Sequence, residues 1–593
     1  MKLSINRNTL WCDLFVLRLS QLGIKYACIS PGSRSTPLTL AFAANNKIET
    51  FPIVDERSSA FFALGLAKSS NSPVAIVTTS GTAVAELYPA IIEAYYQRIP
   101  LIICTADRPN NLRGSGANQT INQFNIYNNH IRFFADAGLP NLKNISSVNL
   151  LAEKAVSISL FENKGPVHLN FPFEKPFEPE NYTDKIEINK IEKLFSKYSF
   201  KLIPAKESKI NFDALVKKFS KERHGLILAG NNNYSKDFAQ LLIKFSETFD
   251  YPIYADGSSP LRFGTHSKKN IIDNFTAIVR SKDFQNQYDP KIIIQFGGAP
   301  TSNVLLEFFK NSKAEKYIIN DYGDRNDPSL TARNIIAVNP IRFCSTMISK
   351  SQKRLGDKSK WLSDFQSMNK VISVTKEQFI ENADFPFEGR IISEIVSTIP
   401  SNSNLMISNS LPIRDTDFFA SVSNKKIKIF ANRGASGIDG INSTAMGIAK
   451  TSKNPTYLLT GDLAFFHDMN GLINSKKFAI PLIIILIDNS GGGIFESLPI
   501  AVYREIMQKN FLTPLNLDFG AFVAAYGGRF FKIKNWRDFH RKLLSSTGNK
   551  TLTVLHLKTN AVNSKLLRQK YWSRAAQEIE KCINEFRNRR AKI

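Results

Sequence analysis

The sequence has few cysteines, and none are spaced as a metal-binding pair. Five cysteines are scattered through 593 residues without a CxxC motif, and the seven histidines show no metal-ligand spacing. The absence of these motifs argues against a disulfide framework and against a zinc site. We expect the five thiols to be reduced and mostly buried.

Long apolar runs are also absent. The longest, residues 481–487, is far shorter than the roughly 20 residues that a membrane span requires, and it is typical of a buried strand. Near the N-terminus, Asp13 and Arg18 interrupt the apolar residues, so no signal-peptide core is visible. We therefore expect a cytoplasmic protein without a membrane span.

Acidic residues are scarce relative to basic ones. The chain has 51 Asp and Glu against 77 Lys and Arg, a formal net charge of +26. Such a balance can indicate nucleic-acid binding. The basic residues are spread along the chain, however, and no RNP-like motif, zinc finger or helix-turn-helix signal accompanies them. We expect no nucleic-acid partner and assign part of the charge to anionic substrates.

What the chain does contain is a repeated alternation of short apolar runs and amphipathic stretches. With 593 residues and 43% hydrophobic content it can build three or four domains. The pattern predicts an α/β protein of three doubly wound domains with mostly parallel sheets, over residues 1–185, 200–350 and 385–593. Strands are predicted near 26–29, 73–79, 100–105, 225–230, 291–296, 317–320, 456–460, 481–487 and 552–557, with a polar helical connector from 351 to 385.

Two short motifs at the ends of predicted strands carry the clearest chemical signal. Gly461-Asp462 follows the run 456–460, and Asn489 follows the run 481–487. The intervening residues 463–488 match the length of a crossover between neighbouring parallel strands. The Asp and Asn side chains are therefore predicted at one edge of a sheet, where open α/β sheets bind ligands.

Oxygen ligands at such an edge suit Mg²⁺. This hard cation accepts carboxylate and amide oxygens, and phosphates often complete its coordination. The three glycines at 491–493 would let the backbone approach a diphosphate closely. Each motif alone is more often a strand-to-turn junction or a loop. Their spacing and their matching positions favour a metal and diphosphate site.

A third feature lies in the first predicted domain. Glu56 stands at a strand-to-helix junction in Val54-Asp-Glu-Arg57, downstream of Pro31-Gly-Ser-Arg-Ser-Thr36. On these residues alone, Glu56 is explained by a favourable negative charge at a helix N-terminus, and an isolated Asp-Glu-Arg indicates no function.

Nine motifs of this kind follow one another along the chain. In order they are Pro31–Thr36, Asp55–Arg57, Thr79–Val84, Thr105–Pro109, Gly116–Gln119, Asn409–Arg414, Asn432–Gly440, Gly461–Gly471 and Asn489–Phe495. This order resembles thiamine-diphosphate-dependent enzymes, and among them the 2-succinyl-5-enolpyruvyl-6-hydroxy-3-cyclohexene-1-carboxylate synthase family of menaquinone and phylloquinone biosynthesis. The general pattern is Gly-Asp-Gly, and this chain has Leu463 at the third position. That leucine is typical of this synthase branch of the thiamine-diphosphate-dependent enzymes. The middle domain matches less specifically.

The resemblance implies a transferase with an aminopyrimidine-binding domain, a central Rossmann-like domain and a diphosphate- and metal-binding domain, in that order. Glu56 would activate the cofactor through its aminopyrimidine ring. The implied ligands of Mg²⁺ or Mn²⁺ are Asp462, Asn489 and the carbonyl of Gly491. The residues implied to contact thiamine diphosphate are Glu56, Thr82, Ser410, Ile438, Asp462, Leu463, Asn489, Gly491, Gly492 and Ile494. For Ile438, ordinary core packing is an equally good reading.

The implied activity is decarboxylation of 2-oxoglutarate, followed by conjugate (1,4) addition of the resulting succinyl-semialdehyde carbanion to isochorismate. Both substrates are dicarboxylates, and arginine binds a carboxylate bidentately and stays charged. A single arginine is more often a surface ion-pair partner, but four lie inside the matched motifs. The implied substrate-binding residues are Ser33, Arg34, Arg108, Asn118, Gln119, Arg414, Arg433, Ile494 and Phe495. Of these, Arg34, Gln119, Arg414 and Arg433 are also implied in catalysis, together with Glu56.

The resemblance further implies a homodimer with shared active sites, in which Glu56 and the metal ligands of one site belong to different chains, and it suggests a homotetramer. One departure concerns Asn303 and Val304, which stand where the family often has lysine or arginine.

Two alternative functions stay open. The chain could be another thiamine-dependent 2-oxo acid decarboxylase or carboligase, similar to acetolactate synthase, or a non-catalytic basic binding protein on the same fold. The sequence does not distinguish Mg²⁺ from Mn²⁺.

Overall fold

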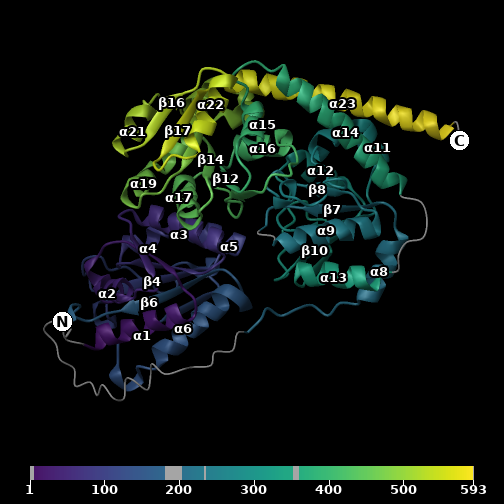
Figure 1. The fold of residues 1–593 in the computed structure, drawn as a ribbon. Coiled ribbons are helices and arrows are strands. Elements are labelled where there is room, and N and C mark those ends of the chain that lie inside the picture. The colour runs from purple at the N-terminus through teal and green to yellow at the C-terminus, as the bar shows by residue number, and fades with distance from the viewer. Residues whose placement is uncertain (1–5, 180–202, 233–234, 352–358, 592–593) are drawn as a thin grey trace. The chain divides into compact units, whose positions relative to one another are not determined.

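Three parallel sheets organise the chain and confirm the predicted α/β class (Figure 1). The computed structural model describes residues 6–179, 203–232, 235–351 and 359–591. These residues form two compact units. The first compact unit comprises the chain up to residue 205 with 432–453 and 466–482, and the second comprises 206–431, 454–465 and 483–593. The predicted domain boundaries at 185 and 200 lie outside the described residues.

The first sheet lies in the first compact unit and has the strand order β2-β1-β3-β4-β6-β5, with every neighbouring pair parallel. Its strands are β1 (Tyr26–Ile29), β2 (Glu49–Pro52), β3 (Val74–Thr78), β4 (Leu101–Asp107), β5 (Phe133–Asp136) and β6 (Pro166–Pro172). The central strands β3 and β4 are buried along their whole length, as their content of Val, Ile and Leu predicts.

Helices cover both faces of this sheet. The helices α1 (Arg7–Gln21), α2 (Thr36–Ala44) and α6 (Ser147–Ser157) share one hydrophobic core with the sheet. The helices α3 (Glu56–Ser70) and α5 (Tyr88–Gln97) also contact it, and the short helix α4 (Thr82–Glu86) lies between them in sequence. Helix α3 also packs closely against α17 (Ile441–Thr451). Glycines make this approach possible, because a Cβ at Gly65 would lie 2.1 Å from the carbonyl oxygen of Thr444.

The central sheet lies in the second compact unit and has the order β11-β10-β9-β7-β8. Its strands are β7 (Gly225–Ala229), β8 (Ile253–Ala255), β9 (Ile292–Phe296), β10 (Glu315–Asn320) and β11 (Asn334–Ala337). The helices α8 (Phe212–Lys221), α9 (Lys236–Phe249) and α13 (Pro340–Lys350) contribute to one core over this sheet. The helices α10 (Phe275–Ile278), α11 (Lys282–Gln287), α12 (Asn303–Asn311) and α14 (Lys360–Glu381) contribute to a second core.

The C-terminal sheet belongs to the same unit and has the order β13-β12-β14-β15-β17-β16. Its strands are β12 (Ser403–Ile407), β13 (Ile427–Ala431), β14 (Thr456–Gly461), β15 (Ile483–Asp488), β16 (Arg529–Lys532) and β17 (Thr553–Lys558). Its helices are α15 (Glu388–Thr398), α16 (Leu411–Phe419), α20 (Arg504–Met507), α21 (Phe519–Ala525), α22 (Trp536–Ser546) and α23 (Ala561–Ala591). The second core continues beneath this sheet, so both sheets of this unit share it.

The predicted strands and the predicted connector helix are confirmed. Each of the nine predicted strands is present within a few residues of its expected ends, and α14 occupies the polar connector. Residues 352–358 of that connector lie outside the described part. Eight observed strands were not among the predicted ones: β2, β5, β6, β8, β11, β12, β13 and β16. Of these, β5, β11 and β16 lie at sheet edges and are short and only partly buried, so their apolar signal is weak.

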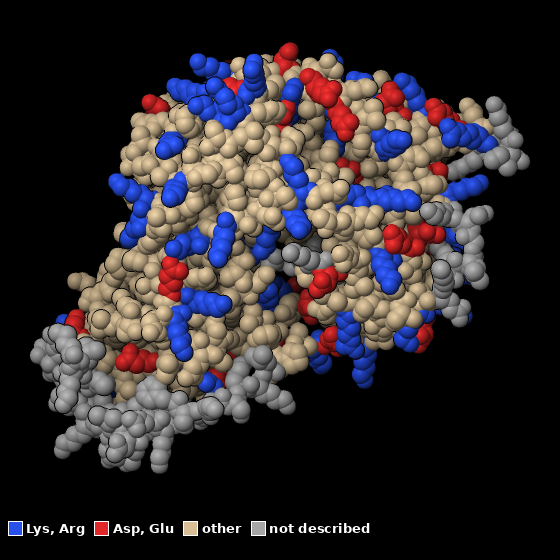
Figure 2. All heavy atoms as spheres, in the orientation of Figure 1, with Lys and Arg blue, Asp and Glu red and all other residues tan. Residues whose placement is uncertain are grey.

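The positive charge is dispersed. Figure 2 shows Lys and Arg side chains spread over the visible face, with Asp and Glu among them. Among the described helices, none has both the length and the apolar character needed to cross a bilayer. The five cysteines are free and buried, as expected from their scatter.

A buried histidine in β6 makes the stability of the first compact unit depend on pH. The Nε2 atom of His168 lies 2.7 Å from the hydroxyl of Thr105, and burial lowers the pKa of His168 to about 3. The folded protein keeps this ring neutral, whereas the unfolded chain takes up a proton below pH 6.5. The contribution of His168 to stability is therefore fully present above that pH and is lost as the pH falls toward 3.

Between pH 7 and pH 5 we expect this single group to cost about 2 kcal/mol of unfolding free energy. Urea unfolding at the two pH values measures the loss. The variant His168→Gln should be less stable at pH 7 but should show a smaller change between the two pH values. An equal pH dependence in both proteins would contradict the assignment.

Candidate functional site

One edge of the C-terminal sheet gathers the predicted metal and diphosphate residues. The strands β12, β14 and β15 are neighbours in the sheet and run parallel. Ser410 lies just after β12, Asp462 begins α18 (Asp462–His467) directly after β14, and Asn489 follows β15. The three side chains therefore follow the carboxyl ends of adjacent strands, where the spacing of the motifs predicts Asp462 and Asn489.

The carboxylate of Asp462 is buried and held by backbone amides. Its Oδ1 accepts a hydrogen bond from the N–H of Leu463 at 2.8 Å, and its Oδ2 accepts one from Gly491 at 2.7 Å. Burial, together with the nearby charge of Asp488, raises the pKa of Asp462 to about 7 in spite of these two bonds. A buried carboxylate in this condition is well suited to a cation, which would restore the stabilisation that burial removes.

The pKa of the neighbouring Asp488 is shifted in the opposite direction. Burial alone would raise its pKa, but hydrogen bonds from His556 and Lys558, each 2.9 Å long, hold the pKa well below its usual value. Asp488 is therefore the stable anion of this pair, and its charge is already balanced by basic partners.

The amide of Asn489 has one satisfied end and one unsatisfied end. Its Nδ2 donates to Oε1 of Glu388 at 3.0 Å. Its Oδ1 is buried without a hydrogen-bond partner in the described part of the chain. A buried polar atom in this state costs free energy unless a ligand completes it. The described residues contain no group of three or more His, Cys, Asp and Glu that could hold a metal, so a cation bound by Asp462 would also need amide or carbonyl oxygens. The Oδ1 atom of Asn489 is one such oxygen.

The glycines after Asn489 are needed for the shape of this loop. Gly491 has φ +116°, and a Cβ there would lie 1.8 Å from the carbonyl oxygen of Leu512. Its own carbonyl accepts a hydrogen bond from Gly493 at 2.8 Å. The N–H of Gly492 in turn donates to Leu512 at 2.8 Å. Backbone from another segment thus closes against this turn.

We expect Gly491→Ala to weaken binding of the predicted cofactor, thiamine diphosphate with a divalent metal, by about tenfold or more, because the turn would have to open and adopt a strained conformation. Isothermal titration calorimetry of the purified protein measures the affinity. Gly548→Ala serves as the control, because a Cβ at Gly548 meets no atom within 4 Å. Equal affinities in both variants would refute the role of this turn.

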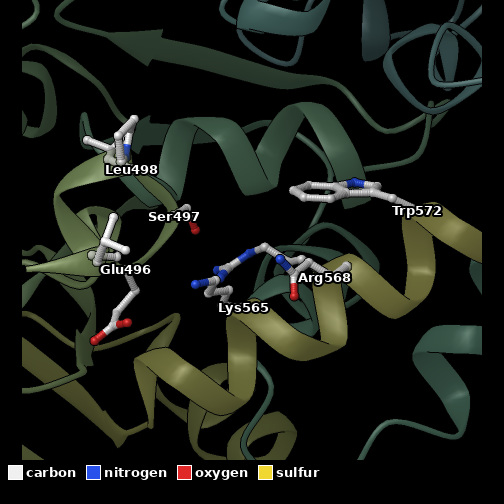
Figure 3. Close-up of a pocket in the computed structure, with 10 residues that line it drawn as sticks. Glu496, Ser497, Leu498, Lys565, Arg568 and Trp572 are labelled. Atoms are coloured by element: carbon white, nitrogen blue, oxygen red, sulfur yellow. The ribbon is translucent and has the colours of Figure 1, made fainter. Parts of the chain in front are cut away.

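A cavity of about 370 Å³ is lined by Glu496, Ser497 and Leu498, which follow the predicted apolar wall in the sequence, and by residues of α23. Ile494 and Phe495 belong to a short 3-10 helix, Gly493–Ser497, and Phe495 packs edge-on against Phe511 with ring centroids 5.1 Å apart. Figure 3 shows Lys565, Arg568 and Trp572 of α23 near Glu496, Ser497 and Leu498. The cavity therefore combines apolar carbon with basic side chains.

In the first compact unit, two predicted substrate-binding arginines lie close together. Arg34 donates to the carbonyl of Phe173 at 2.8 Å, and its guanidinium lies 4.5 Å from the ring centroid of Phe177. Burial, together with the positive charge of Arg108, lowers the pKa of Arg34 to about 10. Burial also lowers the pKa of Arg108. Two neighbouring guanidinium groups of this kind favour an anionic ligand.

Arg108 also shapes the loop that carries Asn118 and Gln119. Its guanidinium donates to the hydroxyl of Ser80 and to the carbonyl of Asn118, the latter at 2.5 Å. Ser80 in turn donates to the carbonyl of Gln119 at 2.9 Å. The side chains of Asn118 and Gln119 are exposed, so the loop offers two amide groups to solvent beside the arginines.

Sequence reasoning missed one residue of this loop. The buried side chain of Gln123 accepts from the N–H of Gly81 at 3.0 Å and donates to Asn170 at 3.0 Å. It thereby ties the loop to the turn before Thr82, which begins α4. Gln123 lies four residues beyond a matched motif in a polar segment, so no local pattern distinguishes it.

Glu56 begins α3, as its position in the sequence predicts. The preceding Asp55 caps the helix, accepting from the N–H of Ser58 at 2.9 Å. Glu56 is therefore not needed as the cap. Burial raises the pKa of Glu56, and the charges of Asp55 and Glu86 add to the effect.

A buried glutamate that sequence reasoning missed holds the loop of Arg433 and Ile438. The carboxylate of Glu93, on α5, accepts hydrogen bonds from the N–H groups of Gly434 and Ala435, each at 2.7 Å, and of Ser436 at 3.2 Å. These residues lie in the first compact unit. Glu93 falls between matched motifs, so only the fold reveals its partners.

Two further predictions concern the second compact unit. Arg414 lies on α16 and donates a hydrogen bond to the carbonyl of Ser410 at 2.7 Å. This bond holds the arginine side chain against the residue that precedes the helix. Asn303, where the family often has a basic residue, is exposed at the start of α12, and Val304 packs against the hydrophobic core. Neither supplies a positive charge.

Comparison with known proteins decides the family. The chain matches the thiamine pyrophosphate enzyme N-terminal TPP binding domain at residues 12–126, the middle domain of thiamine pyrophosphate enzymes at 198–407 and the C-terminal TPP binding domain at 424–557. A protein of Bacillus cytotoxicus named 2-succinyl-5-enolpyruvyl-6-hydroxy-3-cyclohexene-1-carboxylate synthase is 37% identical over 581 residues, which are 95% of this chain and 96% of that protein. The chain belongs to this synthase family.

Other relatives agree. Synthases of the same name from Gloeothece citriformis and Trichodesmium erythraeum are 37% and 38% identical, over 94% and 93% of this chain and 96% of each relative. The family membership confirms the predicted thiamine diphosphate cofactor, the enzyme class and the link to menaquinone biosynthesis.

A solved structure supports the fold of this synthase family member. The crystal structure of benzoylformate decarboxylase from Polynucleobacter necessarius superposes with a TM-score of 0.67, covering 93% of this chain and 98% of that chain at 15% identity. At this identity the likeness concerns the fold alone.

Proposed function

We propose that the protein decarboxylates 2-oxoglutarate and joins the remaining succinyl unit to isochorismate by 1,4-addition, with release of CO₂. The observation that carries the choice of substrates is the pair of neighbouring, partly buried guanidinium groups of Arg34 and Arg108 in a member of the synthase family. Two dicarboxylate substrates require such positive charge, whereas pyruvate would require less.

The residues of the C-terminal sheet would hold the cofactor through a metal. Asp462, the unsatisfied Oδ1 of Asn489 and the carbonyl of Gly491 are the proposed ligands of Mg²⁺ or Mn²⁺. When bound, thiamine diphosphate supplies the electron sink that makes loss of CO₂ and formation of the new carbon–carbon bond possible. The remaining proposed contacts to it are Thr82, Ser410, Ile438, Leu463, Gly492 and Ile494.

Other residues of the chain would orient the substrates. Glu56, with its raised pKa, would hold a proton at the aminopyrimidine ring. Arg34, Arg108, Arg414 and Arg433 would bind the carboxylates, and Ser33, Asn118 and Gln119 would add hydrogen bonds. Ile494 and Phe495 would exclude water, which matters because early protonation would release succinic semialdehyde instead of the product.

We also propose that two copies of the chain share each active site. The family resemblance supports a homodimer in which Glu56 acts together with Asp462 of the partner subunit, and it suggests a homotetramer. A mixture of Glu56→Gln and Asp462→Ala proteins, refolded or co-expressed, should then regain activity, because each mixed dimer contains one intact site and one site with both substitutions. The cytoplasm stays the predicted location.

The test of the proposal is CO₂ release from 2-oxoglutarate by the purified protein with thiamine diphosphate and Mg²⁺. We expect turnover that depends on isochorismate. Turnover of pyruvate but not of 2-oxoglutarate would instead indicate an acetolactate-synthase-like enzyme. No turnover of any 2-oxo acid by protein with bound cofactor would indicate a non-catalytic scaffold.

A further inference from the structure

A buried carboxylate lies directly behind the proposed metal ligand Asn489. Glu388, the first residue of α15, is 1% exposed. Its Oε1 accepts hydrogen bonds from Asn489 Nδ2 at 3.0 Å and from the hydroxyl of Thr559 at 2.9 Å. Its Oε2 accepts one from the guanidinium of Arg568 at 2.7 Å. Both oxygens of Glu388 are thus engaged as acceptors.

Arg568 fixes the position of this carboxylate. The same guanidinium donates from Nε to Oδ1 of Asp415 at 2.7 Å and from its terminal nitrogen to Oδ2 of Asp415 at 2.5 Å. All three side chains are nearly fully buried. Asp415 follows Arg414 on α16, so the cluster connects the loop of Asn489 with that helix. None of the three residues has a role in the proposed chemistry.

The cluster determines which way the amide of Asn489 points. An amide can rotate to exchange its oxygen and nitrogen, and the two orientations have nearly the same shape. An ionised carboxylate only accepts hydrogen bonds, so Glu388 accepts the Nδ2 end and rejects the Oδ1 end. The Oδ1 atom is thereby turned away from Glu388, and it is the atom that lacks a hydrogen-bond partner among the described residues.

We propose that Glu388 is a positioning residue which, held by Arg568, orients Asn489 so that its oxygen and not its NH₂ group faces the metal. This inference rests on the proposed function, because it requires a cation at Asn489. Residues that orient metal ligands from behind typically change metal affinity by 10–100-fold when they are replaced.

The variant Glu388→Gln tests the orientation directly. Arg568 keeps its two bonds to Asp415 and requires an acceptor from residue 388, so the new amide should present its oxygen to Arg568 and its NH₂ group to Asn489. Asn489 should then rotate and direct its NH₂ group at the metal. We expect Mn²⁺ binding in the presence of thiamine diphosphate, measured by electron paramagnetic resonance of free Mn²⁺, to weaken by at least tenfold.

A second substitution should restore binding. In Glu388→Gln/Asn489→Asp, one carboxylate oxygen accepts from the new glutamine and the other faces the metal, whichever way the group rotates. We expect this double variant to bind Mn²⁺ more tightly than Glu388→Gln. A purely structural role of Glu388 predicts no such rescue, and weak binding by the double variant would overturn the proposal.

Glu394→Gln is the matched control. Glu394 lies on the same helix, is also buried, and accepts hydrogen bonds from Arg390 and His540, but it does not touch Asn489. We expect this variant to lower the melting temperature without a change in Mn²⁺ affinity. If Glu388→Gln does not fold, Asn489→Asp alone carries the test, because its carboxylate would face that of Glu388 and we expect weaker Mn²⁺ binding than in the wild type.

The outcomes separate this inference from the proposed function. If the wild type binds no Mn²⁺ with thiamine diphosphate, the proposed metal site fails. If the wild type binds Mn²⁺ and Glu388→Gln binds it equally well, only the orienting role of Glu388 fails. Equal or tighter binding by Asn489→Asp alone would also overturn that role.

Discussion

Replacing Glu56 by glutamine is expected to lower kcat for isochorismate-dependent CO₂ release by about 10³-fold. Glutamine keeps the size of the side chain but cannot exchange a proton with the aminopyrimidine ring. Asp55 caps helix α3 in the place of Glu56, so the helix start should survive the substitution. The variant should therefore keep the melting temperature of the wild type.

Single-turnover and steady-state assays measure the loss, and calorimetry checks that thiamine diphosphate still binds. Glu49→Gln is a suitable control, because Glu49 is an exposed acidic residue of the same compact unit, paired with Lys450. We expect it to retain wild-type activity. A Glu56→Gln protein that keeps a tenth of the wild-type rate would remove Glu56 from the mechanism.

The largest expected loss of stability comes from replacing Arg262, which is fully buried in the second compact unit. Its guanidinium donates to the carbonyls of Ala255 and Ala420, at 2.9 and 2.7 Å, and to Oδ1 of Asp417 at 2.8 Å. Asp417 is 1% exposed, and burial raises its pKa to about 6 although Arg262 opposes the shift. The ion pair fixes α16, the helix of Arg414, to the strand end of β8.

We expect Arg262→Met to lower the unfolding free energy by about 3–5 kcal/mol, because it leaves a buried carboxylate without its counter-ion. Urea unfolding at pH 7 measures this loss. The control Arg342→Met breaks an exposed ion pair with Glu207, and we expect it to cost less than about 1 kcal/mol. Similar losses of unfolding free energy in the two variants would show that the buried ion pair stabilises the protein no more than the exposed one.

Local patterns in the sequence were sufficient for much of the fold. Strands such as β14 and β15 are short apolar runs with polar residues at their ends, and that signal depends only on neighbours in the chain. The same holds for Asp462 and Asn489, whose places after two such runs predicted a common sheet edge. Motif resemblance then supplied the family, which the comparisons confirm.

The edge strands and the supporting residues did not follow from local patterns. β5, β11 and β16 are half-exposed and lack a continuous apolar run. Gln123 and Glu93 lie outside every matched motif, and their partners are backbone amides on other segments. Nothing in the neighbouring residues distinguishes such side chains from ordinary surface amides and acids.

The sequence by itself determined the α/β class, the thiamine diphosphate family and the identities of the proposed metal ligands. Only the tertiary structure decided how those ligands are held. Glu388 meets Asn489 across 101 residues and Arg568 across 180 residues of chain, and Arg568 meets Asp415 across 153. Such contacts exist only after the sheets and helices have packed, because hydrogen bonds between distant side chains depend on their positions in space and leave no periodic or local pattern in the chain.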